Sequence, residues 1–308
     1  MSIILHHYPL SPYSEKIRAM FGFTHIAWAS CITSEAPPRG KLDLLSGGYN
    51  RIPIGQLGSD IFCDSNIIAD EIATMTNNPA LSDRSLDQTT LKQRQWLETT
   101  LWFACVNRAF SLSLLKRIAK DKGLLNLLRF LKDRIEMGSK ASISMGSPKS
   151  APKHIHQALD DLTKELGHND FIGGEEPTII DFAAYHCFWF LHEVGQKDDL
   201  KKYPKILNWY HRMNAFNSAP TQEVSIEGAL NEAKNSQPRP LDAQYLQDHR
   251  IGSKIIISPS DYRKVPVSGV LAGVDEHRWI ILREQSETGP VHLHFPTKAV
   301  DITIRLGN

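Results

Sequence analysis

A serine–proline pair stands near the start of the chain, in the segment HHYPLSPYSEKIRAM. Pro12 suits the first position of a helix, because it has no N–H group to leave unpaired there. Ser11 would then be the N-cap, accepting a hydrogen bond from the N–H of residue 14 while its own hydroxyl hydrogen stays free. A sulfur anion at this turn would meet a hydroxyl donor and the positive end of a helix dipole. Both lower the pKa of a bound thiol, so the turn could stabilise a thiolate; the alternative is a helix cap with nothing bound.

Two further pairs of residues could contribute to a binding site. Asp64 and Ser65 precede the apolar segment NIIADEIATM, so Ser65 is expected to cap a helix there. A serine at a helix start can also bind a carboxylate through its hydroxyl and its backbone N–H, and Asp64 could meet an ammonium group. Ile52 and Pro53 open a short strand, where a proline could equally belong to a loop or a sheet edge.

The elements that must position these residues change character along the chain. Residues 1–80 are expected to fold in the order strand, helix, strand, loop, strand, strand, helix. Residues 85–225 indicate helices separated by loops, with a Ser- and Gly-rich loop at 138–154. The segment PTIIDFAAYHCFWFLHEV begins with a capping box made by Thr178 and Asp181. It is apolar nearly all round, so we expect a buried central helix.

A third composition begins after residue 225. Residues 226–250 are Pro-rich and are expected to be a linker. Residues 251–308 contain five short strand-like segments, which predict a small all-β, barrel-like domain. His292 and His294 would share one face of a strand and could be half of a metal site.

No third or fourth metal ligand is evident in the sequence, although three candidates lie near the two histidines in this region: Asp261, Glu276 and His277. We therefore expect polar residues on a solvent-facing strand, and no metal.

Charge and cysteine usage exclude several classes of protein. The 308 residues carry a formal net charge of +1, and the acids and bases of the C-terminal region are interleaved, so no nucleic-acid partner is expected. No apolar segment is long enough for a membrane span, and the N-terminus does not resemble a signal peptide. The four cysteines show neither a CxxC nor a zinc spacing, and we expect reduced, buried thiols in the cytoplasm. Cys63, beside Asp64, is expected to pack in the core rather than to do redox chemistry.

Residues 1–220 resemble the cytosolic glutathione transferase family. The resemblance is carried by three segments in the expected order: YPLSPYSEKIR, RIPIGQLGSDIFCDS and PTIIDFAAYH. It implies a thioredoxin-like domain at 1–80, an all-helical domain at 85–225, and a C-terminal β domain outside the usual family boundary. It also implies glutathione as co-substrate, a small electrophilic substrate, a detoxification role and a homodimer. With serine at the thiol-activating position, the chain is similar to bacterial members.

The same resemblance assigns roles to individual residues. Ser11 would activate the thiol of glutathione; serine here, rather than cysteine, implies attack of the thiolate on an electrophilic carbon. A cis bond before Pro53 would let the backbone of Ile52 pair with extended glutathione, and Asp64 and Ser65 would hold the γ-glutamyl end. Alternatives remain for two of these roles. Tyr8, Tyr13 and Ser14 are other hydroxyl donors for the thiol, and Arg39, Lys41 and Arg51 are candidates for the glycine carboxylate.

Two other functions remain open. The chain could bind glutathione without turnover, or be a protein-interaction scaffold whose C-terminal β domain binds the partner. A glutathione-dependent isomerase or peroxidase would differ from a transferase only in its substrate.

Overall fold

The computed structural model describes residues 2–124, 127–128, 131–133, 135, 145–217, 219–298 and 300–305. Its strands are β1 (Ile3–His7), β2 (Trp28–Ile32), β3 (Ile54–Leu57), β4 (Asp60–Cys63), β5 (Gln222–Glu223), β6 (Lys254–Pro259), β7 (Val267–Val274), β8 (Arg278–Gln285), β9 (Gly289–Pro296) and β10 (Val300–Arg305). Its α-helices are α1 (Pro12–Thr24), α2 (Leu42–Ser46), α3 (Ser65–Thr76), α4 (Gln88–Trp96), α5 (Trp102–Ala109), α6 (Leu112–Lys122), α8 (Ala151–Leu166), α9 (Ile179–Trp189), α10 (Pro204–Asn214) and α11 (Ile226–Lys234).

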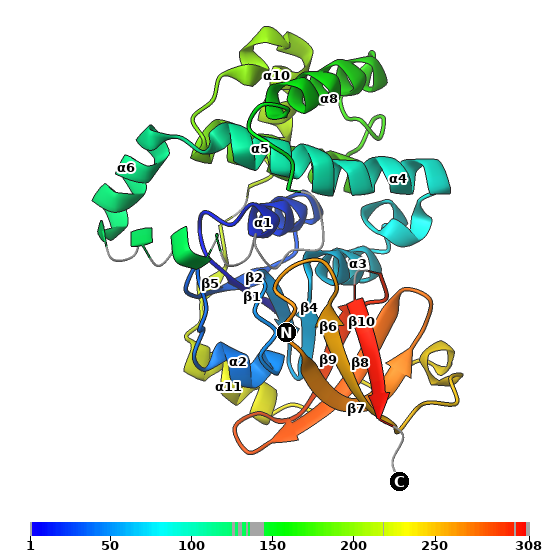
Figure 1. Ribbon diagram of the computed structural model, residues 1–308. Coiled ribbons are helices and arrows are strands. Elements are labelled where there is room, and N and C mark those ends of the chain that lie inside the picture. Colours follow the sequence, from blue (N-terminus) through cyan, green and yellow to red (C-terminus); the bar gives the residue numbers. More distant parts are fainter. Residues whose placement is uncertain are drawn as a thin grey trace.

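The N-terminal domain has the expected order of elements around a mixed sheet. Strand β1 pairs in parallel with β2 and antiparallel with β3, and β3 pairs antiparallel with β4. Helices α1 and α3 pack together with the helical domain in one core cluster, and α1 lies between the sheet and the α4–α5 helices (Figure 1). Helix α2 and helix α11 belong to a second cluster, which includes the C-terminal strands. The N-terminal sheet therefore contributes apolar residues to both cores.

The starts of two helices decide where the candidate site lies. Ser11 is the N-cap of α1 with Pro12 at the first position, as the sequence predicts. The prediction for α3 was wrong by one residue. Asp64 is its N-cap and accepts the N–H of Asn66 at 2.9 Å, while Ser65 is the first helical residue. The carboxylate of Asp64 satisfies a free N–H group at the helix start, so Ser65 is not needed as the cap.

The helical domain is built around α9, every residue of which is buried. Its predicted capping box is confirmed: Asp181 accepts the N–H of Thr178 at 2.9 Å. Part of the predicted loop at 138–154 lies outside the described residues, and α8 already begins at Ala151 within it. Among the described residues, no helix combines the length and the apolar character needed to cross a membrane.

The C-terminal region contains the five predicted strands, and they do not stand apart from the rest of the chain. They follow the antiparallel order β10-β6-β7-β8-β9, and β9 then pairs in parallel with β4. The result is one ten-stranded sheet shared by the two regions.

The segment expected to be a linker also packs against the sheet. It contains helix α11, whose Ala229 and Ala233 are buried. Their carbonyl groups accept hydrogen bonds from Gln56 and Ser59 of the β3–β4 hairpin, at 2.8 and 3.0 Å.

Candidate active site

Two neighbouring cavities lie where the N-terminal domain, the helical domain and the loop after β6 meet. The first, of about 220 Å³, is lined by several charged side chains and is called the polar cavity below. The second, of about 260 Å³, is mostly lined by apolar side chains and is called the apolar cavity. Both have five wall residues in common: Tyr13, Arg51, Ile52, Phe103 and Tyr262.

The predicted site residues are distributed over these two cavities. Pro53, Asp64 and Ser65 line the polar cavity, Ser11 lines the apolar cavity, and Ile52 lines both. The Ile52–Pro53 peptide bond is cis, as the resemblance implies. The fold thus brings together five residues that lie up to 54 positions apart in the sequence.

The hydrogen bonds of Ser11 leave its own proton available. Its Oγ accepts from the N–H of Ser14 at 3.2 Å and from the hydroxyl of Ser14 at 2.8 Å. Both bonds use Ser11 as the acceptor, so its O–H can donate to a third group. The hydroxyl of Ser14 donates its hydrogen to Ser11, and Ser14 does not line either cavity. Of these two serines, Ser11 is therefore the better donor to a ligand.

A buried network holds the turn before α1 in place. Arg18 donates to the carbonyl of Pro9 at 3.0 Å and to Glu15 at 2.6 and 3.0 Å. The hydroxyl of Tyr185, on the central helix α9, donates to the same Glu15 carboxylate at 2.8 Å. The helical domain thereby fixes the start of α1, and with it the position of Ser11.

Tyr8 and Tyr13 remain alternative donors. Tyr8 lines the apolar cavity and Tyr13 lines both cavities. The ring of Tyr13 packs against Trp102 and His186, with ring centres 5.4 and 4.9 Å away. Burial raises the pKa of Tyr13 well above its usual value, so this hydroxyl stays protonated and can only act as a neutral donor.

Acidic groups dominate the polar cavity around the start of α3. Asp64 is held at φ 128°, a conformation that residues other than glycine rarely adopt. Burial raises the pKa of its carboxyl, while Arg51 and Lys16 oppose that effect. Glu98, from the helical domain, lines the same cavity. Burial opposes its ionisation, but Arg94 and Lys16 outweigh it and hold the pKa of Glu98 at about 2. Because Glu98 is already paired with Lys16 at 2.7 Å and with Arg94 at 3.2 Å, Asp64 is the candidate partner for the ammonium group of a ligand.

Of the three basic candidates for a ligand carboxylate, one reaches both cavities. Arg39 donates to the carbonyls of residues 34, 35 and 50, so it has a structural role in the loop. Lys41 pairs with Glu227 of α11 at 2.9 Å, with both side chains more than half exposed. Arg51 lies in the walls of both cavities and is the remaining candidate.

Sequence reasoning missed the contribution of the β6–β7 loop to this site. Asp261 forms an ion pair with Arg51, and Tyr262 lies under the Arg51 guanidinium at 4.0 Å from the ring centre. No motif signals this contact, because it joins segments 210 positions apart. Trp102, Phe103 and Phe110 also line the apolar cavity. Their helical spacing was visible in the sequence, but such spacing does not distinguish a pocket wall from a core.

Two remaining expectations concern cysteine and histidine. Cys63 is fully buried, as expected, and burial raises the pKa of its thiol well above the usual value. The prediction of a solvent-facing position was wrong for His294, which is 2% exposed. Helix α3 contacts β9, the ring of His294 packs against that of Phe62 with ring centres 5.0 Å apart, and His294 forms a hydrogen bond with Asp60 of β4 at 2.9 Å.

Two sequence models match segments that contribute to the cavities. Residues 5–80 match the glutathione S-transferase N-terminal domain, and residues 119–212 match the glutathione S-transferase C-terminal domain. The chain belongs to the glutathione S-transferase family. This membership accounts for the thioredoxin-like domain and the helical domain, and leaves β6–β10 as an additional region.

Known structures and one curated protein extend the comparison. The crystal structure of a GST-like protein from Pseudomonas syringae is 26% identical with a TM-score of 0.80, covering 99% of this chain and 100% of that one. That relative therefore spans the additional strands too. Glutathione S-transferase unclassified 2 from Bombyx mori is 16% identical with a TM-score of 0.50, over 71% of this chain and 91% of that one, which supports the fold alone. Prostaglandin E synthase 2 from Danio rerio is 31% identical over 72 residues; the match spans 23% of this chain but only 18% of that protein.

Proposed function

We propose that this member of the family is a glutathione transferase that uses Ser11 to activate the thiol of glutathione. The observation that carries the proposal is the hydrogen-bonding pattern of Ser11. Ser11 Oγ accepts hydrogen bonds from the N–H and from the hydroxyl of Ser14, so its own O–H can donate to a ligand. Ser11 lies at the start of α1 and in the wall of the apolar cavity. A hydroxyl donor and a helix N-terminus at one point both favour a thiolate over a thiol.

Glutathione would lie extended across the wall residues that the two cavities share. Its γ-glutamyl ammonium would meet the acidic side of the polar cavity at Asp64, and its carboxylate would bind at Ser65. The backbone of Ile52, beside Pro53, would pair with the cysteine residue of glutathione. Arg51 would attract the glycine carboxylate, and its position in both cavity walls supports this role.

The reaction would be attack of the glutathione thiolate on an electrophilic carbon in the apolar cavity. The sulfur forms a bond to carbon, and either a leaving group departs with its electron pair or the electrons move into a conjugated acceptor that is then protonated by water. Aromatic wall residues such as Trp102 and Phe110 favour an apolar electrophile. We further propose a cytoplasmic homodimer with a role in detoxification, in keeping with the resemblance.

Calorimetric titration with glutathione tests the binding half of this proposal. The wild-type chain should bind, and Ser65→Ala should bind about tenfold more weakly, because a hydrogen bond to a charged group contributes about 1.5 kcal/mol. Ser225→Ala, which removes an exposed helix cap remote from both cavities, is the matched control and should bind as the wild type does. Absence of binding by the wild type at millimolar glutathione would remove the transferase proposal and favour the interaction scaffold. Binding without turnover across a panel of electrophiles would favour the non-catalytic glutathione-binding protein.

A further inference from the structure

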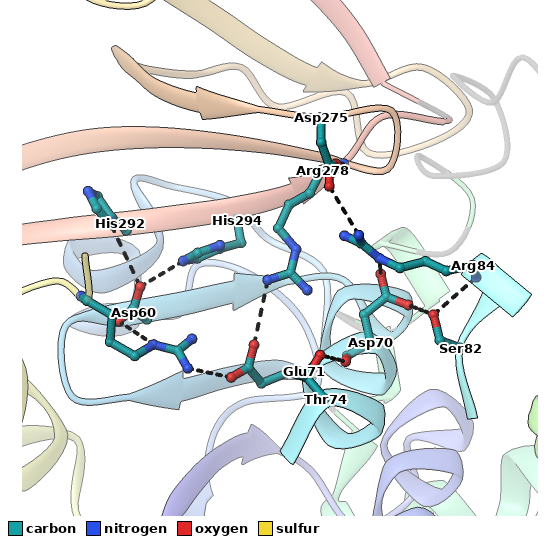
Figure 2. A network of polar contacts seen from close by, with 11 residues as sticks. Asp60, Asp70, Glu71, Thr74, Ser82, Arg84, Asp275, Arg278, His292 and His294 are labelled. Carbon is teal, nitrogen blue, oxygen red and sulfur yellow. Dashed lines mark hydrogen bonds and ion pairs between the residues drawn. The ribbon is translucent and has the colours of Figure 1, made fainter. Parts of the chain in front are cut away.

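Three side chains that can bind a metal ion meet where the two regions of the sheet join. Strands β4 and β9 pair in parallel, with Asp60 opposite His292 and Phe62 opposite His294. Because side chains alternate along a strand, Asp60, His292 and His294 lie on one face of the sheet (Figure 2). The sequence indicated the two histidines as possible ligands but no third one. In the fold, Asp60 lies beside them on a strand more than two hundred positions away in the sequence.

The three ligand atoms form a compact and mostly buried group. His294 Nε2 lies 2.9 Å and His292 Nδ1 lies 3.7 Å from the same oxygen of Asp60, and all three atoms are within 4.8 Å of one another. His292 Nδ1 is buried, faces this carboxylate and makes no hydrogen bond in the described part of the chain. The side chain of His292 is 11% exposed, so water can reach the edge of the group.

We propose that Asp60, His292 and His294 bind a divalent transition-metal ion, Zn²⁺ in the first place, with water as the fourth ligand. Two imidazoles and one carboxylate with an open position are ligands that zinc accepts in tetrahedral sites. Bonds of about 2.0 Å to a tetrahedral zinc put its ligand atoms about 3.3 Å apart, between the two distances to Asp60. The two histidine nitrogens lie within 4.8 Å of each other and would reach this separation by rotation of their rings. The ion would link β4 to β9, and so join the glutathione S-transferase domains to the additional strands.

Neighbouring charges position the carboxylate and limit the affinity. The other oxygen of Asp60 accepts from the backbone N–H and the Nε of Arg239, at 3.1 and 3.0 Å. Glu71 pairs with Arg278 at 3.6 Å (Figure 2). Glu71 also pairs with Arg239 at 2.6 Å, so the two cations and the two carboxylates balance in charge. Such outer contacts orient metal ligands.

Two features oppose tight binding. The guanidinium of Arg239 repels the incoming ion, and metal binding at His294 Nε2 moves the ring proton to Nδ1, which has no acceptor among the described residues. We therefore expect micromolar rather than nanomolar affinity.

Titration of the chelator-treated full chain with Co²⁺ tests the site, because tetrahedral Co²⁺ reports its ligands through visible absorption. The wild type should bind one equivalent with a tetrahedral spectrum that Zn²⁺ abolishes by displacement. His292→Gln should weaken binding by about tenfold or more, since loss of even an outer contact costs a site that much. His249→Gln, which changes a histidine side chain that is 92% exposed, is the control and should bind like the wild type.

A second measurement uses the wild type alone and does not depend on how a variant folds. Zn²⁺ should raise the midpoint of thermal unfolding, and the rise should grow with the logarithm of its concentration above the Kd. Mg²⁺, which prefers all-oxygen sites, should not raise the midpoint. If the wild type binds no Co²⁺, or if His292→Gln binds it unchanged, the three residues form only a hydrogen-bonded cluster and the proposal fails. None of these outcomes depends on glutathione binding.

Discussion

Arg51 of the N-terminal domain pairs with Asp261 of the loop between β6 and β7, and its guanidinium stacks 4.0 Å above the ring of Tyr262. The additional C-terminal region therefore supplies part of the wall of both cavities. The same contact gives Arg51 an anionic partner at the place where we propose that glutathione, itself an anion, binds. Asp261 and the ligand carboxylate would compete for one cation.

This competition predicts the effect of Asp261→Asn. Removal of one negative charge beside Arg51 should tighten glutathione binding by about fivefold at low salt, equivalent to about 1 kcal/mol for a partly exposed ion pair. Calorimetry at two ionic strengths measures it, and the gain should shrink as salt screens the charges. Asp301→Asn changes an exposed acid of β10 and is the control. Weaker binding by Asp261→Asn would instead show that Asp261 holds Arg51 in its working position.

Ser11→Ala should separate catalysis from binding. The variant lacks the hydroxyl that we propose stabilises the thiolate, so kcat for conjugation should fall by about tenfold to a hundredfold, corresponding to 1.5–3 kcal/mol for a bond to a charged group. The Kd for glutathione should change little.

The control for this substitution is its hydrogen-bond partner. Ser14→Ala removes a donor to Ser11 but leaves the Ser11 hydroxyl in place, so its rate should stay near that of the wild type. If Ser11→Ala conjugates at the wild-type rate, the hydroxyl that activates the thiol is that of Tyr8 or Tyr13, which line the same cavity.

Buried neutral histidines should make stability depend on pH. Burial lowers the pKa of His6 and of His186 from 6.5 to about 4. Between these two values the unfolded chain binds protons that the native chain does not, so the free energy of unfolding falls as the pH falls from 6.5 to 4. Each histidine contributes a slope of up to about 1.4 kcal/mol per pH unit.

Urea unfolding at several pH values, with wild type and variants, checks this slope. His186→Gln should flatten the dependence between pH 6.5 and 4, whatever its effect on stability at pH 7. His249→Gln changes an exposed side chain, so the free energy of unfolding should depend on pH as steeply as it does in the wild type. An unchanged slope in His186→Gln would mean that this ring is protonated in the native chain.

The sequence predicted the parts of this molecule that local signals encode. Ser11 before Pro12, and Thr178 with Asp181, each mark a helix start within four residues, and the structure contains both helices there. Short strand-like segments separated by turn residues after Ile251 likewise predicted the five C-terminal strands. In such cases the backbone groups that need partners, and the side chains that supply them, are neighbours in the chain.

The same local signals could not predict which strands distant in the sequence pair with each other. Nothing in the sequence around Asp60 shows that β4 pairs with β9, since parallel pairing leaves no turn between the two strands. The expectation of a solvent-facing His294 failed for this reason. The contact of Arg51 with Asp261 depends on the same junction, because β9 anchors the additional strands beside the cavities.

The four cysteines should be unreactive in the native chain. All are buried, and burial raises the pKa of Cys31 to about 11 and that of Cys63 well above its usual value. A thiol-specific disulfide reagent at pH 8 should therefore modify none of them until denaturant is added, and then all four, because the thiolate is the reactive form. Fast modification of one equivalent in the native chain would contradict this, and Cys63→Ser would show whether the thiol beside Asp64 is responsible.

Asp181 should be among the most sensitive positions for stability. Its carboxylate accepts five hydrogen bonds: from the backbone N–H groups of Ile172 at 2.6 Å, Gly173 at 3.0 Å and Thr178 at 2.9 Å, from the hydroxyl of Thr178 at 3.3 Å, and from the indole of Trp209 at 2.9 Å. Asp181→Ala leaves several buried donors unpaired, at about 1–3 kcal/mol each, so we expect a loss of at least about 3 kcal/mol in the free energy of unfolding. Asp161→Ala, at a half-exposed acid of α8, should cost less than about 0.5 kcal/mol. Asp181→Ala should also affect catalysis. Helix α9 holds Glu15 at the start of α1 through the hydroxyl of Tyr185, so the variant should lose conjugation activity under conditions in which the chain is still folded.

Chemical unfolding measures the loss of stability, and initial rates at one temperature measure the loss of activity. If Asp181→Ala is as stable as Asp161→Ala, water replaces the carboxylate and the prediction is wrong.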